Sequence, residues 1–548
     1  MNYAKYKAAP KFNFPERTWP DKELAKAPIW CSSDLRDGNQ ALPVPMNIKQ
    51  KIEFFKLLCE IGFKEIEISF PSASDTDYEL TRRLIEEDLI PDGVCIQVLV
   101  QSREDLIQKT FESLNGAKKA IVHLYVATSP LHRDVVFQKS REEVRAMAAT
   151  GAELFNKYAE IYGRDRFIFE FSPEVFTSTE MEYAAEVCNA VLDVWKPSPE
   201  RRAIINLPST VELSSPNIYA DQIEYMCKNL KYRESIAVSL HAHNDRGCGV
   251  AATELGLLAG ADRVEGTLFG NGERTGNADI VVLALNMYTH GIDPGLDFSN
   301  MDRIESIYRD LTAMTIHPRQ PYAGELVFTA FSGSHQDAIR KGMAYIGNDY
   351  DRWEMPYLPI NPADLGKTYE AIIRVNSQSG KGGVSFILEQ KFGIKLSRAM
   401  QKEFGGIATR LSDQSQNELS PEEIRELFDR EYINIAEPYG LVSYKESNNG
   451  ATHVDAVIKD HGEEKHIQGD GNGLLDAFCK AFSAHIGAQF DIVDYSEHSL
   501  DLGTDSRAIS YIQILDAGKE SFFGAGISHN ISRSSVRAVV SAVNRMAR

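Results

Sequence analysis

The N-terminal half of the chain alternates between short apolar runs rich in β-branched residues and longer segments with helical periodicity. Between the runs, stretches such as IKQKIEFFKLLCEIG and EMEYAAEVCNAVLDVW repeat apolar residues every three to four positions. Eight strands that alternate with helices over about 250 residues predict a (β/α)8 TIM barrel, an α/β fold. A doubly wound sheet is the alternative, and it is less favoured because no G-x-G-x-x-G follows the first strand. The eight runs are 27–35, 63–70, 94–100, 119–127, 166–172, 202–208, 236–243 and 262–269.

The pattern changes beyond the barrel, and this divides the chain into four expected parts. They are an N-terminal extension (1–25), the barrel (26–295), linker subdomains (296–430) and a separate α+β module (431–548). Near the end of the linker, Ser420, Pro421 and Glu423 predict the start of a helix. Serine is a good N-cap, proline suits the first helical position, and glutamate at the third position completes a capping box.

Two glycine-rich stretches lie beyond the predicted barrel. NSQSGKGG (376–383) lacks the Ser/Thr and the upstream glycine of a phosphate-binding P-loop, so we interpret it as a flexible loop. Gly469, Gly471 and Gly473 precede a predicted helix in the C-terminal module. They are consistent with a binding site for a small ligand, because glycine lets a ligand approach the backbone closely. A tight structural turn is an equally good interpretation.

Polar side chains gather where the predicted strands end. Reactive groups of barrel enzymes lie at the C-terminal ends of the strands and in the loops that follow them. In this chain, the ends of the predicted strands carry possible metal ligands, acids, bases and hydroxyls. Their presence favours a catalytic barrel over one that only senses a small molecule. The candidates are Asp37, His123, Glu174, Thr210, His241, His243 and the loop GNGERTGN.

The two histidines of HAHNDRG point to a metal. Residues i and i+2 of a strand face the same side, so His241 and His243 both project inward, about 7 Å apart along the chain. Two hydrogen-bonded core histidines are the alternative. Asp37 ends the first strand, which lies near the seventh once the barrel closes. Two imidazoles and a carboxylate suit a divalent cation that acts as a Lewis acid, and Asn277 offers a further oxygen.

Other polar residues near these ends have two interpretations each. Arg36 could stabilise an oxyanion beside the metal or form a surface salt bridge. Glu174 could act as an acid or base or be simply solvated. The loop FGNGERTGN (269–277) presents backbone N–H groups that could receive an anion or a carbonyl, but it matches neither a Walker loop nor a Rossmann fingerprint.

Composition narrows the class of protein. The chain has 548 residues, which predicts two to four domains, and its apolar fraction of 43% is that of a soluble globular protein. A net charge of −19 argues against broad nucleic-acid binding. No apolar stretch is long enough for a membrane span, and the N-terminus lacks the apolar core of a signal peptide. The seven scattered cysteines, none in a C-x-x-C pair, predict reduced thiols and a cytoplasmic location.

Several motifs carry a resemblance to a known family. DLRDGNQ (34–40), HAHNDRG (241–247) and GTLFGNGERTGN (266–277) resemble signature segments of the acyl-CoA Claisen-condensing barrel enzymes. This group contains the 2-isopropylmalate, homocitrate and citramalate synthases, with hydroxymethylglutaryl-CoA lyase as a relative. FSGSHQDAIRKG (331–342), the segment 356–383 and RSSVRAVVSAVNR (533–545) are similar to the longer 2-isopropylmalate synthases, so the resemblance extends over nearly the whole chain.

The resemblance implies roles for individual residues. Asp37, His241 and His243 match metal ligands, with Asn277 in the metal shell. A second set of residues matches catalytic or substrate-binding positions. Two residues of this set, His335 and Tyr357, lie beyond the barrel, and in the family the matching residues reach the active site of the partner subunit. The C-terminal module matches a leucine-binding regulatory domain, in which we assign Gly471, Gly473 and Tyr495 to regulation. The second set comprises the catalytic candidates Arg36, Glu174, His335 and Tyr357, of which the last two lie beyond the barrel, and the substrate-binding candidates His123, Thr210 and Glu273.

The resemblance also implies an activity. Members of this kind join acetyl-CoA to 2-oxoisovalerate and hydrolyse the thioester to 2-isopropylmalate and CoA, the first committed step of leucine biosynthesis. The expected cofactor is a divalent metal, Mg²⁺ before Mn²⁺ or Zn²⁺, with a monovalent cation such as K⁺ in addition. A homodimer and feedback inhibition by leucine are expected. Homocitrate or citramalate synthesis is the nearest alternative, followed by a metal-dependent lyase or aldolase reaction on the same barrel.

Overall fold

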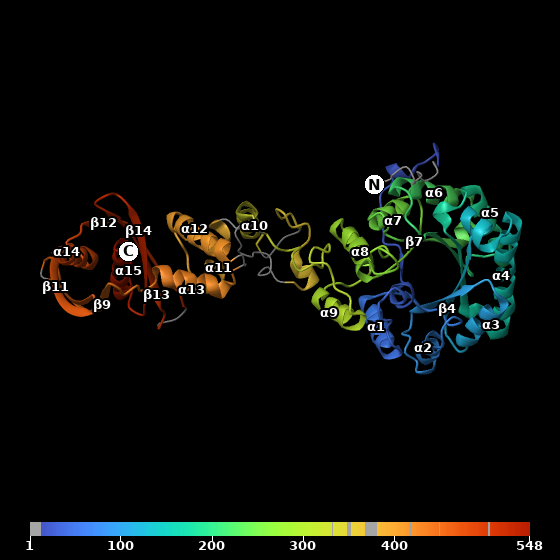
Figure 1. Ribbon diagram of the computed structural model, residues 1–548, viewed down its shortest axis with the longest axis horizontal. Helices are drawn as coiled ribbons and strands as arrows, with labels where there is room; N and C mark the ends of the chain where they lie inside the picture. The colour runs from blue at the N-terminus through green and yellow to red at the C-terminus, as the bar shows by residue number, and fades with distance from the viewer. Residues whose placement is uncertain are drawn as a thin grey trace. The chain divides into compact units, whose positions relative to one another are not determined.

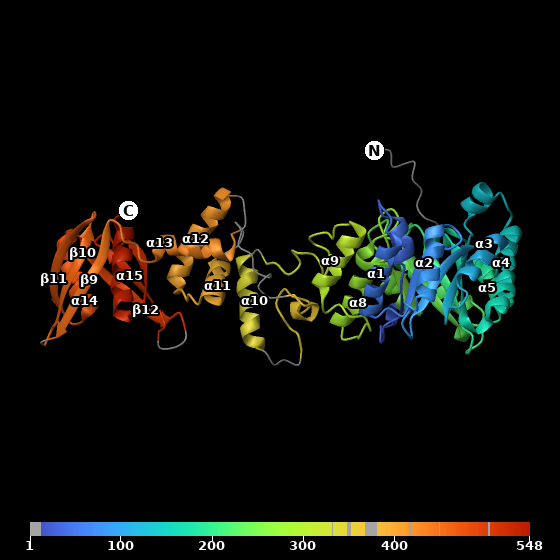
Figure 2. The ribbon, with the colours of Figure 1, turned by 90° about the horizontal axis from the view of Figure 1, so that it is seen from below.

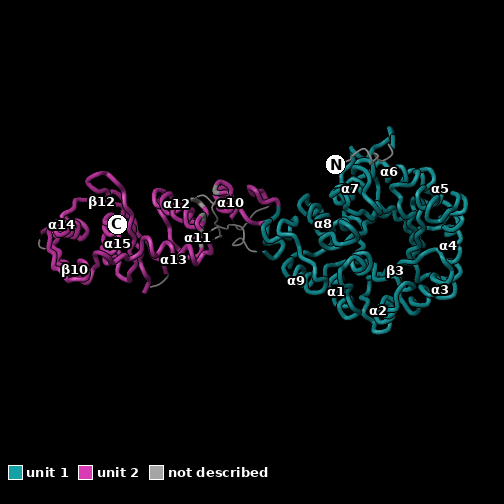
Figure 3. Tube along the Cα trace, viewed as in Figure 1, with its two compact units in different colours: residues 1–327, 360–367 teal, residues 328–359, 368–548 magenta. Residues whose placement is uncertain are grey.

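The structure is a computed structural model that describes residues 12–330, 332–347, 352–367, 381–415, 419–448, 450–501 and 505–548. The chain divides into two compact units, residues 1–327 with 360–367 and residues 328–359 with 368–548 (Figure 3). Residues 1–11 of the predicted N-terminal extension and residues 376–380 of the predicted flexible loop lie outside the described residues. None of the described helices combines the length and the apolar character that a membrane crossing needs.

The first unit is the predicted barrel. Strands β1 to β8 are parallel and close into a ring, because β1 pairs with both β2 and β8 (Figure 1). The strands are β1 (Ile29–Ser32), β2 (Glu65–Ser69), β3 (Cys95–Gln101), β4 (Ala120–Ala127), β5 (Phe167–Glu174), β6 (Ala203–Ser209), β7 (Ile236–Ala242) and β8 (Arg263–Gly266). The predicted fold class is therefore confirmed.

Eight helices surround the strands and explain the helical periodicity of the sequence. They bury apolar side chains, as Phe54 and Leu58 of the first helix show. Asn47 and Ser140 begin two of these helices as N-caps in complete capping boxes. The helices are α1 (Ile48–Ile61), α2 (Asp75–Glu86), α3 (Glu104–Ser113), α4 (Arg141–Tyr162), α5 (Met181–Trp195), α6 (Pro216–Asn229), α7 (Gly249–Leu258) and α8 (Ile280–Thr289).

A π-helical turn, Asp34–Gly38, follows β1 directly. Such turns are rare and are frequent at functional sites. Because all eight strands run in the same direction, this turn and the loops after the other strands meet at one end of the barrel. The turn therefore carries Arg36 and Asp37 to the same rim as the residues that follow β7.

Two further segments pack onto the outside of the barrel. Helix α9 (Met301–Thr312) contacts α1. The N-terminal segment docks on α6, where the buried carboxylate of Asp221 accepts hydrogen bonds from Trp19 Nε1 at 2.8 Å and from Arg17 Nη2 at 2.7 Å. The backbone N–H of Thr18 donates to Glu224 Oε2 at 2.8 Å. These contacts fix the described part of the predicted extension to the barrel.

The second unit begins with helices. They are α10 (Gly333–Ile346), α11 (Lys381–Phe392), α12 (Arg398–Ser415) and α13 (Pro421–Tyr432). The last starts with the capping box predicted from Ser420 and Glu423. Leu388, Phe404 and Phe428 from these helices share one buried cluster with residues of the strands that follow.

The C-terminal module of the second unit consists of two successive repeats, each with three antiparallel strands and one helix. The first is β9 (Tyr439–Asn448), β10 (Thr452–Asp460), β11 (Glu463–Gly471) and α14 (Leu474–Ile486). The second is β12 (Phe490–Ser499), β13 (Ala508–Asp516), β14 (Ser521–Ser528) and α15 (Ile531–Met546). Figure 2 shows α14 and α15 alongside the strands, and both helices and both sheets contribute to one apolar core.

Candidate functional site

The site predicted from the strand ends is one cavity at the C-terminal end of the barrel. Its volume is about 360 Å³. Eight of the side chains that the sequence analysis singled out line this cavity together. They are Arg36, Asp37, His123, Glu174, Thr210, His241, His243 and Glu273.

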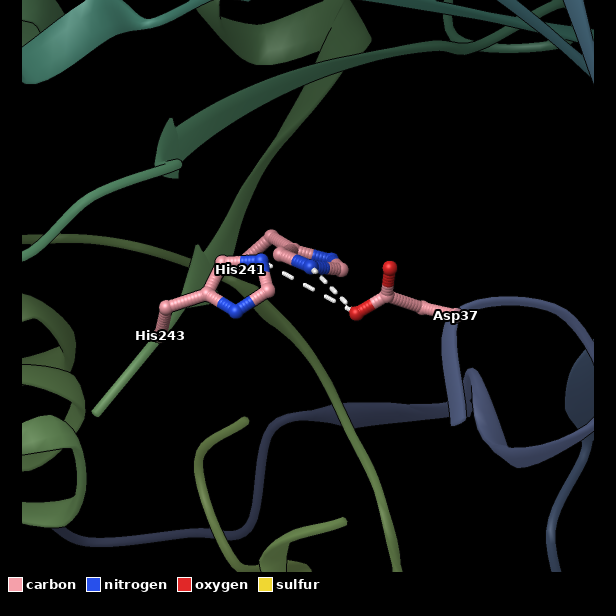
Figure 4. Close-up of side chains that lie close together, drawn as sticks. All are labelled: Asp37, His241 and His243. Carbon is pink, nitrogen blue, oxygen red and sulfur yellow. Dashed lines mark ion pairs between the residues drawn. The ribbon is translucent and has the colours of Figure 1, made fainter. Parts of the chain in front are cut away.

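Asp37, His241 and His243 converge within this cavity. Figure 4 shows both imidazoles turned toward the carboxylate. Asp37 Oδ2 lies 3.8 Å from His241 Nε2 and 3.8 Å from His243 Nε2. These separations exceed the range of a hydrogen bond, so the three groups converge without satisfying one another. All three side chains are buried, and they form a group whose ligand atoms lie within 4.8 Å of one another.

The donor set fits a divalent cation. Asn277 is buried beside Asp37, to which its Nδ2 donates a hydrogen bond of 2.6 Å, while its Oδ1 has no partner among the described residues. A buried amide oxygen without a partner is costly unless something else satisfies it. Two imidazole nitrogens, a carboxylate oxygen and an amide oxygen are the ligands that divalent ions take in catalytic sites.

Electrostatics support the same interpretation. Burial alone raises the pKa of Asp37, but the Arg36 guanidinium and the imidazoles more than offset it and hold that pKa well below its ordinary range. Burial and the neighbouring His241 lower the pKa of His243 to about 4. Burial opposes the charge on His241, yet the nearby Asp37 carboxylate and the hydrogen bond to Glu265 raise its pKa to about 9. Asp37 is thus ionised and His243 neutral, as metal ligands must be, whereas His241 must release its Nε2 proton when a cation binds.

Arg36 is held in place by two carboxylates. Its Nη1 lies 3.0 Å from Asp37 Oδ1 and its Nε lies 2.8 Å from Glu67 Oε2. Burial opposes its charge, but Glu67 and Asp37 raise its pKa, so the guanidinium stays protonated. Its ion pairs are thus with buried carboxylates, unlike the surface salt bridge that was the alternative, and the same side chain lines the cavity.

His123 and Glu174 stand on neighbouring strands, β4 and β5. His123 Nε2 is 2.7 Å from Ser172 Oγ. Burial raises the pKa of the Glu174 carboxyl above its ordinary value, which makes the group a better proton donor near neutral pH. Thr210 lies beside this strand end, where its hydroxyl accepts a hydrogen bond of 3.0 Å from the N–H of Val175.

The structure adds residues that the sequence reasoning missed. Ser172, Asn206, Tyr125 and Arg274 also line the cavity. Ser172 could have been found, because it alternates with Glu174 on β5 and so faces the same side. Arg274 lies in the loop 269–277 that the sequence singled out, but its ion pair with Asp245, which follows β7, depends on loops that meet only in the fold.

Comparisons with known proteins decide the family. Residues 27–307 match a family model described as HMGL-like, residues 325–389 one described as alpha-isopropylmalate synthase, post-catalytic domain-like, and residues 418–547 the LeuA allosteric (dimerisation) domain. The chain is 56% identical to 2-isopropylmalate synthase of Acetoanaerobium sticklandii, over 100% of this chain and 97% of that one. It is also 56% identical to 2-isopropylmalate synthase of Clostridium acetobutylicum, over 100% of this chain and 99% of that one.

The chain belongs to the 2-isopropylmalate synthase family. It is therefore an acyltransferase, as the resemblance in the sequence implied. The HMGL-like family is metal-dependent, and this chain supplies a candidate ligand group. Among solved structures, the chain is similar to hydroxymethylglutaryl-CoA lyase from Pseudomonas aeruginosa, with 17% identity, 54% of this chain and 95% of that one covered, and a TM-score of 0.44.

His335 and Tyr357 belong to the second unit. Their rings stack on each other, with centroids 3.8 Å apart and planes 22° apart. Tyr357 is 59% exposed and adopts a positive φ of 63°, which is uncommon for a bulky residue. His335 and Tyr357, which the resemblance identified from two separate motifs, thus lie side by side.

The regulatory candidates fall in both repeats of the C-terminal module. Gly471 ends β11, and a Cβ there would lie 2.4 Å from the backbone nitrogen of Ala477 on α14. Close packing of strand and helix therefore explains this glycine. Gly473 is the N-cap of α14, and a Cβ there would meet nothing within 4 Å. Tyr495 lies in the second repeat, where its hydroxyl is 3.0 Å from Ser535 Oγ.

Proposed function

We propose that the chain condenses acetyl-CoA with 2-oxoisovalerate and hydrolyses the thioester, which yields 2-isopropylmalate and CoA. The observation that carries this proposal is the convergence of Asp37, His241 and His243 beside Arg36 in one cavity, in a chain 56% identical to enzymes with that name. Under this proposal, the chain supplies the first committed step of leucine biosynthesis and works in the cytoplasm.

Different side chains of the cavity have different roles in the proposed reaction. Asp37, His241, His243 and Asn277 would hold a divalent ion, which when bound supplies Lewis-acid polarisation of the keto acid carbonyl. We expect Mg²⁺ there rather than Mn²⁺ or Zn²⁺, with K⁺ as an additional monovalent cation. The Arg36 guanidinium stabilises the alkoxide that develops on the carbonyl oxygen.

The remaining residues bind the keto acid and move protons. His123, Thr210 and Glu273 line the cavity as candidates for substrate contacts. Removal of a methyl proton from acetyl-CoA needs a base. The candidates for this base are the carboxylate of Glu174 or, from the partner subunit of a homodimer, the stacked pair of His335 and Tyr357. The match to a LeuA dimerisation domain supports the dimer.

We expect 2-oxoisovalerate to support CoA release better than 2-oxoglutarate, pyruvate or glyoxylate. One methylene in an apolar pocket changes kcat/KM by about ten- to 200-fold, so a margin of tenfold or more is expected over each. A thiol-release assay with acetyl-CoA and each keto acid measures it. Preference for 2-oxoglutarate would make the chain a homocitrate synthase, and preference for pyruvate a citramalate synthase.

Leucine is expected to inhibit the intact chain, and Gly473→Asp to abolish the response. The substitution fits the fold, because Gly473 has extended backbone angles, its Cβ position is open, and aspartate is a good N-cap. Inhibition requires that leucine bind the less active state more tightly, with a coupling of about five- to 150-fold. The half-inhibiting leucine concentration should rise at least tenfold.

Asn448→Asp is the matched control for this test. It adds the same charge to the same module at the exposed end of β9, where aspartate can still accept the hydrogen bond from the N–H of Gly450, and it should remain sensitive to leucine. Equal inhibition of the parent and of Gly473→Asp would remove the N-terminus of α14 from the regulatory site.

A further inference from the structure

A layer of buried charge lies beneath the three candidate metal ligands, inside the barrel. Its centre is Glu265 on β8, which is 1% exposed. The register of β7 and β8 pairs His241 with Glu265, so the two side chains start from adjacent backbone positions. His241 Nδ1 lies 2.8 Å from Glu265 Oε2.

Three more side chains hold the Glu265 carboxylate. Oε1 accepts hydrogen bonds of 2.8 Å from Gln97 Nε2 and of 2.8 Å from Arg263 Nη1. Oε2 accepts a longer one of 3.3 Å from Asn206 Nδ2. Both oxygens are thus fixed from β3, β6 and β8, and the carboxylate has no freedom to turn away from His241.

The same layer also reaches the other side of the cavity. Gln97 Nε2 lies 3.4 Å from His123 Nδ1. Asn206 Nδ2 donates a 3.0 Å hydrogen bond to Ser172, whose hydroxyl contacts the other nitrogen of His123. One carboxylate therefore anchors hydrogen bonds toward the metal side and toward the keto acid side of the site.

His123, Glu170 and Glu265 themselves satisfy the spacing of a metal-binding group. A guanidinium already supplies the positive charge there, since Arg263 Nη1 lies 2.8 Å from Glu265 and 3.4 Å from Glu170. Arg263 is fully buried, and its desolvation is offset only if these carboxylates stay paired with it. We therefore do not assign a second cation to this group, and Glu265 acts through its neighbours.

We propose that Glu265 is a positioning residue for the metal site. It accepts a hydrogen bond from Nδ1–H of His241, so that Nε2, which lies on the side of Asp37, is the nitrogen left to bind a cation, and it fixes the ring against the frame of Gln97 and Arg263. Carboxylate partners of this kind set the tautomer and orientation of metal-binding histidines. The inference rests on the proposed metal site formed by Asp37, His241 and His243.

Glu265→Gln tests the proposal, because it keeps the size of the side chain and removes its charge. Loss of such a partner typically weakens metal binding by about ten- to 100-fold. We expect that rise in the Kd for Co²⁺, measured by titration calorimetry on metal-free full-length protein, together with a changed visible absorption spectrum of the bound Co²⁺. Both readouts are independent of turnover.

Glu170→Gln is the matched control. It replaces a buried carboxyl group beside the same Arg263, but among the described residues Glu170 forms no hydrogen bond or ion pair with His241. Burial raises the pKa of Glu170 well above its ordinary value, so the change to glutamine alters the charge of the layer less. Its Co²⁺ affinity should stay within about threefold of the parent, well below the loss expected for a missing partner.

Unchanged affinity and an unchanged Co²⁺ spectrum in folded Glu265→Gln would overturn the proposal. If circular dichroism shows that this variant does not fold, Glu265→Asp replaces it, since aspartate keeps the charge for Arg263 and withdraws it from His241. Parent-like affinity of Glu265→Asp would then overturn the proposal. A parent chain that binds no Co²⁺ would instead contradict the metal site itself, so the two failures are distinguishable.

Discussion

Replacement of His243 by alanine is expected to remove the bound divalent ion and the condensation activity together, while the barrel stays folded. His243 is one of three groups that converge on a point, and its Nδ1 has no hydrogen-bond partner among the described residues. Its loss therefore costs the fold little. Lewis-acid stabilisation of several kcal/mol disappears, and a loss of about 4 kcal/mol lowers the rate about 10³-fold.

Metal content by elemental analysis and thiol release together measure this effect. His290→Ala is the matched control, because His290 is an exposed histidine of the same barrel that follows α8. It should keep both the metal and the activity. Full metal content and full activity in His243→Ala would show that the ligand assignment is wrong.

Arg36→Gln is expected to lower kcat by about 10²- to 10³-fold, the cost of one lost oxyanion donor, while metal binding persists. The guanidinium stands 3.0 Å from Asp37 and 2.8 Å from Glu67, so it faces the reacting centre from a fixed position. Arg36→Lys should lose less than Arg36→Gln, because lysine keeps the charge but cannot bridge both carboxylates with a planar group. Steady-state kinetics with the keto acid at saturating metal, combined with metal analysis, separate this role from that of His243.

Arg36→Gln also leaves the buried Glu67 without its cation, so its thermal unfolding midpoint should fall. Arg17→Gln is the comparison, because Arg17 also pairs with a buried carboxylate, that of Asp221, but lies outside the cavity. Its kcat should match the parent. A parental kcat in Arg36→Gln, or a loss of metal as complete as in His243→Ala, would contradict the role assigned to Arg36.

The barrel was predictable because its strands are buried on both faces and therefore read as continuous apolar runs. The strand β7 illustrates this, since all of its residues are buried. The two repeats of the C-terminal module were not predicted. In β12 most residues are exposed, and the sequence FDIVDYSEHS carries little of the alternation that marks a half-buried strand.

Within the site, the spacing of residues along one strand predicted which side chains converge, whereas contacts between strands could not be predicted. His241 and His243 were predicted to converge because residues i and i+2 share a face. The partnership of His241 with Glu265 depends on the register of β7 and β8, which no pattern within either strand specifies. The π-helical turn that presents Arg36 and Asp37 was likewise not predicted, because no local residue pattern in DLRDGNQ distinguishes such a turn from an ordinary loop.

The most direct test of the account is the identity of the product. Purified chain with Mg²⁺, 2-oxoisovalerate and acetyl-CoA labelled with ¹³C in its acetyl group is analysed by mass spectrometry, with released CoA measured in parallel. We predict labelled 2-isopropylmalate in equal amount to the CoA, and neither product in the His243→Ala variant. Labelled acetate with no labelled 2-isopropylmalate would show that the cavity hydrolyses the thioester without condensation, and would contradict the account.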